Sequence, residues 1–212
     1  MVDVDSSGAA AVQRRRTWMI GGILLLAPVL LDMIAGMPGA WPGVLSGPLF
    51  AAALVIFAIG LGRGGSVTAR RPLGTGTLIG FAIWNLAWPW VMHLIADPGI
   101  VDGVVADDYY ATMQMLATSG QVVSLILAII VVTQIGRVRV VPRPWNWAPL
   151  WALVAVVVGQ VLQRLLVAAD LTALLMMIGP FYSLIAVLPT AFLGVLAIVL
   201  STRRDPASVI VY

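Results

Sequence analysis

The chain has 212 residues, of which 61% are hydrophobic and 10% are charged. Soluble proteins have about 45–50% apolar and about 25% charged residues, and a water-soluble fold of this length could not bury so much apolar surface. The composition therefore excludes an ordinary soluble domain and indicates a protein that lies in a lipid bilayer. The net charge of +3 does not indicate a nucleic-acid partner, because the arginines stand in short clusters between apolar stretches.

The start of the chain, residues 1–16, is polar and rich in small residues, and we expect it to be a disordered tail. It ends in Arg14, Arg15 and Arg16, directly before the first apolar stretch at residues 17–37. That stretch is longer than the apolar region of a cleaved secretory signal, which has about 7–15 residues. It therefore predicts an uncleaved transmembrane helix.

Five further apolar stretches follow, and the chain ends in a cytoplasmic tail at residues 202–212. A helix needs about 20 residues to cross the hydrocarbon core of a bilayer, and five of the six stretches reach that length comfortably. The sequence thus predicts an all-α membrane protein with one domain at residues 17–201. This domain is a bundle of six transmembrane helices, with spans at 17–37, 44–62, 76–96, 112–136, 147–169 and 172–201.

The basic residues between the stretches predict the orientation. They fall in alternate connections, whereas the remaining connections contain no arginine and two of them carry aspartates. Because arginine-bearing connections stay in the cytoplasm, both termini are expected there and the protein in the cell membrane. Tryptophans near the ends of the stretches, such as Trp18, fit the aromatic belts of a bilayer. The arginines outside the apolar stretches are Arg14, Arg15, Arg16, Arg63, Arg70, Arg71, Arg137, Arg139, Arg143, Arg203 and Arg204.

Three ionisable side chains lie within the apolar stretches, namely Asp32, His93 and Arg164. Such groups are costly inside a bilayer and often belong to a functional site. At about 1.5 Å of rise per residue, each lies roughly 5–8 Å inside the outer end of its own stretch. We therefore expect all three in one layer of the outer leaflet, together with Gln114 and Gln163.

Two interpretations of this polar layer remain open. In the first, the layer is a pocket for a small polar or anionic ligand. Arg164 holds an anionic group or pairs with Asp32, and His93 and the glutamines supply hydrogen bonds. In the second, an Asp32–Arg164 pair locks two helices together, and the glutamines join helices at about 0.6 kcal/mol per hydrogen bond. Charges near helix ends also extend toward the lipid headgroups at modest cost.

Prolines lie within several of the stretches, and Pro89 and Pro180 are the ones that mark candidate site residues. Pro89 removes a backbone donor and crowds the carbonyl of Asn85, which predicts a kink, and Pro180 interrupts the last stretch. Broken helices often line transport sites, so Asn85, Pro89 and Pro180 are candidates for a ligand pathway. The alternative is a purely structural kink, because proline is common in membrane helices. The pair Gly76 and Gly80 permits close helix packing.

The residue types that are missing narrow the choice of functions. The chain has no cysteine, lysine or glutamate and only one histidine, so thiolate catalysis, Schiff-base chemistry and an H-E-x-x-H zinc site are excluded. We expect no enzyme, no catalytic residue, no metal site and no cofactor. The sequence favours a small transporter or the substrate-capturing membrane subunit of a transport system, with the lipid bilayer, a ligand and other membrane subunits as partners. The alternative is an accessory or scaffold subunit that transports nothing.

Overall fold

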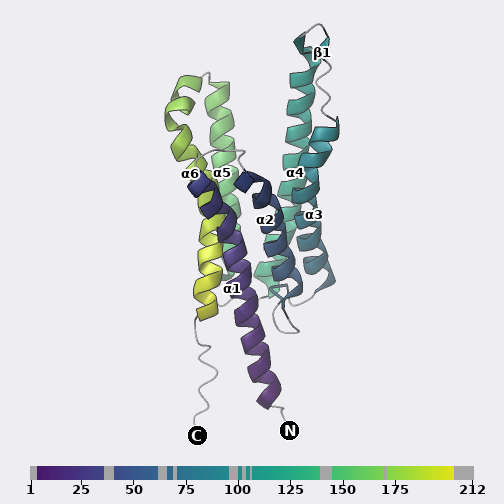
Figure 1. Ribbon diagram of the computed structural model, residues 1–212, viewed down its shortest axis with the longest axis vertical. Coiled ribbons are helices and arrows are strands. Elements are labelled where there is room, and N and C mark those ends of the chain that lie inside the picture. Colours follow the sequence, from purple (N-terminus) through teal and green to yellow (C-terminus); the bar gives the residue numbers. More distant parts are fainter. Residues whose placement is uncertain are drawn as a thin grey trace.

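The computed structural model describes residues 4–35, 41–61, 66–68, 71–95, 100–101, 104–105, 107–138, 145–169 and 171–202. Over these residues the fold is all-α, apart from one short hairpin, and contains six α-helices and one 3₁₀ turn (Figure 1). The helices are α1 (Val4–Ala35), α2 (Trp41–Ile59), α3 (Pro72–Ile95), α4 (Asp107–Val138), α5 (Ala148–Ala168) and α6 (Thr172–Thr202), and the 3₁₀ turn is η1 (Trp145–Trp147).

The prediction of an all-α fold with six helices is confirmed. Within the described part of the chain, three helices are long and apolar enough to cross a membrane, namely Pro72–Ile95, Tyr109–Val138 and Trp145–Ala168. Two shorter apolar helices are found at Leu45–Ile59 and Val187–Thr202. From α2 to α6, the helices begin and end within a few residues of the predicted stretches.

The start of the chain differs from the expectation. Helix α1 begins at Val4, so residues 4–16 are helical where the sequence favoured a disordered tail. The run Ala9–Ala11 and the arginines that follow are good helix formers. Extending an existing helix also avoids the cost of a new nucleus. In Figure 1, this part of α1 extends beyond the lower ends of the other helices.

The connection between α3 and α4 contains a hairpin that we did not expect. Strands β1 (Ile100–Val101) and β2 (Val104–Val105) pair in antiparallel fashion, with Ile100 opposite Val105. All four residues are β-branched, and the two between the strands in the sequence are Asp and Gly. An Asp-Gly pair between β-branched residues is a strong signal for a two-residue hairpin turn, and the sequence therefore contained the information.

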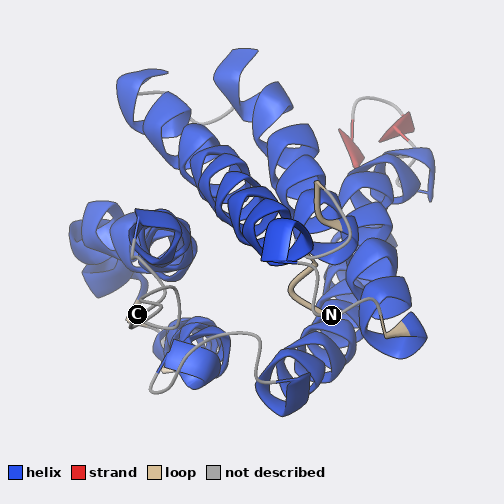
Figure 2. Ribbon diagram, turned by 90° about the horizontal axis from the view of Figure 1, so that it is seen from below, coloured by secondary structure: helices blue, strands red, loops and turns tan. Residues whose placement is uncertain are grey.

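The helices form a ring that follows the order of the chain. Helix α1 packs extensively on both α2 and α6, and α2 with α3, α3 with α4 and α5 with α6 are the other close pairs. The ring is completed by α4 and α5, which contact each other much less than the other neighbours do. Figure 2, seen from below, shows the six helices around a centre that no helix occupies.

Glycines bring α1 close to its two neighbours in the ring. Gly22 of α1 faces Gly194 of α6, and a Cβ atom built on Gly22 would lie 2.8 Å from the Gly194 carbonyl oxygen. On the other side, the ring of Phe57 in α2 covers Gly21, where a Cβ atom would lie 2.5 Å from the ring. Small residues allow this backbone approach between apolar helices.

Aromatic packing joins α3 to α4. The Trp84 indole Nε1 donates a hydrogen bond to Ser124 Oγ at 3.0 Å, and the rings of Trp84 and Trp88 are stacked with their centroids 4.8 Å apart. Trp88 in turn lies directly over Gly120 of α4, which has no room for a side chain. The four residues hold the two helices together as a hairpin.

Within the residues that the structure describes, the close helix packing that was predicted at Gly76 and Gly80 is not found, in contrast to the packing at Gly22, Gly194 and Gly120. A Cβ atom at either glycine would have nothing within 4 Å among the described residues. The two glycines therefore do not bring α3 close to another helix in the part of the chain that the structure covers.

Candidate functional site

The structure shows one contact between helices at the predicted polar layer. Arg164 Nη2 on α5 donates a hydrogen bond to Oε1 of Gln121 on α4, and both side chains are exposed. Gln121 was not among the candidate residues, although it lies seven positions after Gln114 and shares its helix face. The side chain of Asp32 lies outside the described residues, so its pairing with Arg164 remains a prediction.

The other members of the layer have exposed side chains. His93 lies in the last turn of α3, Gln163 is next to Arg164, and Gln114 borders a shallow depression along α4. The expectation of one layer assumed that the outer helix ends are level. Figure 1 shows instead that the upper ends of α1 and α2 lie lower than those of α3 to α6. Asp32, three residues before the end of α1, is therefore on a helix that ends below the others.

The candidates at the predicted kinks do not face an enclosed space. Asn85 Nδ2 donates a hydrogen bond to the Phe81 carbonyl one turn earlier, at 2.8 Å, and Pro89 is exposed. Neither Asn85 nor Pro89 lines the central cavity. The backbone of α6 is helical through Pro180, but the side chain of Pro180 lies outside the described residues.

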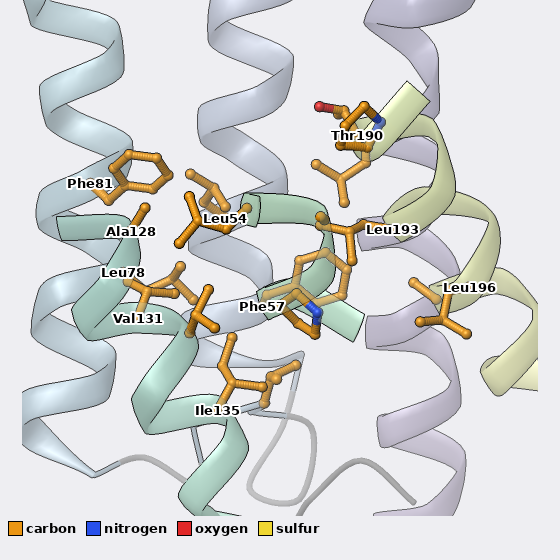
Figure 3. Close-up of a pocket in the computed structure, with 18 of the residues that line it drawn as sticks. Leu54, Phe57, Leu78, Phe81, Ala128, Val131, Ile135, Thr190, Leu193 and Leu196 are labelled. Carbon is orange, nitrogen blue, oxygen red and sulfur yellow. The ribbon is translucent and has the colours of Figure 1, made fainter. Parts of the chain in front are cut away.

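An internal space lies in the middle of the ring of helices. It is a cavity of about 350 Å³ whose wall takes side chains from all six helices, from η1 and from the connection between α2 and α3 (Figure 3). The volume falls in the usual range of small-molecule sites, about 300–1,000 Å³. The wall is almost wholly apolar and contains no charged side chain. Figure 3 labels Leu54, Phe57, Leu78, Phe81, Ala128, Val131, Ile135, Thr190, Leu193 and Leu196.

The floor of the cavity is the segment that follows α2. Gly60 ends the helix in a left-handed conformation, with φ 72°, which reverses the chain. The next amide, at Leu61, donates to Thr17 Oγ1 of α1 at 2.9 Å. Val67 then returns beneath the ring, where its amide donates to the Phe57 carbonyl at 3.0 Å and its side chain enters the cavity wall.

Buried hydroxyl groups hold this floor in place. Ser66 Oγ donates to the Ala58 carbonyl at 2.6 Å and is 3.0 Å from Thr68 Oγ1. Thr68 Oγ1 is also 2.8 Å from Thr75 Oγ1, which ties the floor to the first turn of α3. Ser66 and Thr68 are both buried. The floor is thus a hydrogen-bonded part of the bundle.

Trp18 is the exception among the buried polar groups. Its side chain is 7% exposed and lines the cavity, and its indole Nε1 has no hydrogen-bond partner among the described residues. A buried donor without a partner costs about 1–3 kcal/mol. The position of Trp18 beside the arginines predicts a place in the interfacial belt, where the indole N–H would meet water and headgroups. The structure places the ring inside the bundle instead.

The chemistry available at the site is limited. Over the residues that the structure covers, no group of three or more His, Cys, Asp or Glu side chains is placed to hold a metal ion. The cavity offers a large apolar contact area with very few polar atoms. Such a wall favours apolar ligands, because a polar group without hydrogen bonds is costly to bury.

Comparison of the chain with protein families, with curated proteins and with solved structures finds no match. The fold and the site define the class by themselves. This is an all-α protein of six described helices, three of which could span a membrane by length and composition, arranged around an apolar cavity.

Proposed function

We propose that the chain is an integral protein of the cell membrane, that all six helices cross the bilayer and that both termini are cytoplasmic. Three features support this topology. The arginines alternate between connections, and Arg71 and Arg137 are exposed at the lower ends of α3 and α4. In addition, Arg15 Nη2 donates to the Thr202 carbonyl at 3.3 Å, so the start of the α1 span and the end of α6 lie together at the lower end.

Within the bilayer, the protein binds an apolar small molecule, as a small transporter or as the substrate-capturing membrane subunit of a transport system. The observation that carries this proposal is the apolar cavity of about 350 Å³ at the centre of the ring. Side chains such as Phe57, Leu78 and Val131 offer no compensation for the lost hydration of a sugar or an ion. The ligand in the cavity is therefore a molecule that dissolves in the membrane, unlike the polar or anionic ligand that the outer residues suggested.

A cavity-filling substitution tests the proposal. Ala152 on α5 lines the cavity, whereas Ala155, one turn further along the same helix, is exposed. In Ala152→Phe the new ring occupies ligand space, so we expect loss of a bound apolar molecule that the wild-type protein retains through purification. Ala155→Phe adds the same ring outside the cavity and should keep the molecule. Mass spectrometry of organic extracts of the purified proteins measures this.

Two outcomes would refute the cavity as a ligand site. One is a wild-type protein that retains no apolar molecule and binds none when it is added. The other is equal retention in Ala152→Phe and Ala155→Phe. Thermal unfolding of both variants, monitored in the same detergent, verifies that each is folded.

The alternative function, an accessory or scaffold subunit, has one observation in its favour. The Arg164–Gln121 hydrogen bond joins two helices, as expected if the polar residues serve packing. A second polypeptide that copurifies in mild detergent, together with a wild-type cavity that takes up no apolar molecule, would favour this function over ligand binding.

A further inference from the structure

The buried indole N–H of Trp18 has no hydrogen-bond acceptor among the described residues. Trp18 belongs to a cluster of buried apolar side chains that includes Ala58, Leu78 and Val131. None of these side chains has a hydrogen-bond acceptor, and an indole N–H can only donate. Almost all buried polar groups in proteins are hydrogen-bonded. Because the indole ring borders the cavity, a small rotation of the ring would bring this donor to an acceptor that enters there.

Neighbouring buried donors at the same end of the bundle do have partners. Thr17, adjacent in the chain, donates from Oγ1 to the Gln13 carbonyl at 3.0 Å, and Ser66 Oγ donates to the Ala58 carbonyl at 2.6 Å. Packing at this end therefore satisfies the hydroxyl donors of Thr17 and Ser66. The unpartnered indole is a local feature of the cavity wall.

We propose that the cavity binds a neutral, mainly hydrocarbon molecule with a carbonyl oxygen, such as a ketone or an ester, and that Trp18 Nε1–H donates to this oxygen. The inference rests on the proposed apolar-ligand function and specifies the chemistry of the ligand. A carboxylate or phosphate does not fit, because the wall has no charged group to compensate a buried anion.

The position of Trp18 also defines the orientation of the ligand in the cavity. Trp18 lies near the cavity floor, about two turns below Leu25 along α1. The apolar rings of Phe50 and Phe81 lie further up, and meet edge to face with their centroids 6.4 Å apart. The ligand oxygen therefore lies toward the floor and the hydrocarbon toward these two rings.

Two matched probes test the proposal on the full-length protein in lipid nanodiscs. One is a ten-carbon methyl ketone, and the other is the hydrocarbon in which a methylene group replaces its oxygen. The wild-type protein should bind the ketone about fivefold to tenfold more tightly, because one neutral hydrogen bond contributes that much. In Trp18→Phe this preference should disappear, while the hydrocarbon still binds and so reports an intact cavity.

A spectroscopic measurement identifies the hydrogen bond directly. The infrared carbonyl stretch of isotope-labelled ketone should move to lower frequency in the wild-type protein, and the shift should be absent in Trp18→Phe. Trp145 and Thr190 also line the cavity and serve as controls. Trp145→Phe removes another indole N–H, and Thr190→Val removes a hydroxyl group at nearly constant shape. Both variants should keep the shift.

The outcomes distinguish the proposed role of Trp18 from the proposed apolar-ligand function. Equal wild-type binding of both probes, or a shift that survives Trp18→Phe or depends on Thr190, overturns the role of Trp18 and leaves the apolar-ligand function standing. Binding of neither probe to the wild-type protein overturns both.

If Trp18→Phe does not fold, the indole N–H signals of the wild-type protein in NMR test the proposal instead. One signal that moves with the ketone but not with the hydrocarbon supports the proposal, and none moving refutes it.

Discussion

Gly22 on α1 and Gly194 on α6 occupy the place where the two helices come closest, and each would clash with the other helix if it had a Cβ atom. The Cβ positions lie 2.8 and 3.1 Å from the opposite carbonyl oxygens. In lipid, helices gain little by hiding apolar surface from each other, so close backbone packing supplies much of their attraction. The α1–α6 contact therefore depends on the absence of two side chains.

Substitution of these glycines should weaken the bundle. Gly22→Leu forces α1 away from α6, and overpacking of this kind costs about 1–3 kcal/mol of unfolding free energy. Gly80→Leu is the matched control, because Gly80 has open space around it and its change should stay within about 0.5 kcal/mol. Thermal or denaturant unfolding in detergent measures both. Equal destabilisation of the two variants would show that the crossing is not tight.

The helices themselves could be predicted from the sequence, but the cavity could not. Six apolar stretches, five of them comfortably of membrane length, give the positions of the helices directly. The sequence contains no comparable signal for which side of each helix faces the centre of the bundle. Leu78 is 2% exposed and Ile83 is 61% exposed on the same helix, yet both are aliphatic. Lipid is as apolar as a protein interior, so the sequence shows no contrast between the two environments.

Polar residues within apolar stretches stand out in the sequence as site candidates, whereas the apolar side chains of the cavity wall do not. The spacing of Gln114 and Gln121 indicates a polar face on α4, but the contact of Arg164 with Gln121 can be found only from the fold. Trp18 follows a run of arginines, which suggested an interfacial position. Burial of Trp18 results from its neighbours on α2, α3, α4 and α6, which are distant in the sequence.

Helices α4 and α5 are the least closely packed neighbours in the ring, and the Arg164–Gln121 hydrogen bond links them. Double-mutant cycles measure that link. The coupling between Arg164→Ala and Gln121→Ala should be about 0.6 kcal/mol, the average for hydrogen bonds between membrane helices, and at most about 1.7 kcal/mol. The cycle of Arg164→Ala with Asp32→Ala tests the pairing predicted from the sequence. Coupling in that cycle alone would contradict the Arg164–Gln121 link.

The whole molecule has a topology that can be measured by labelling, because the chain contains no cysteine. Tyr110 and Arg71 are exposed at opposite ends of the bundle, near the start of α4 and of α3. We expect a membrane-impermeant maleimide to label Tyr110→Cys in intact cells and Arg71→Cys only after the membrane is opened. Labelling of Arg71→Cys in intact cells would refute cytoplasmic termini.

The ring order has a consequence for biosynthesis. Helix α1 leaves the ribosome well before α6, yet the two form one of the most extensive contacts in the bundle. Until α6 is inserted, the Gly22 face of α1 has only lipid or insertion factors against it. The cavity wall is also incomplete, because it needs Leu193, Leu196 and Ala197 of α6. A nascent chain that stops before α6 therefore lacks part of the cavity wall, and the proposed ligand can bind only once α6 is in place.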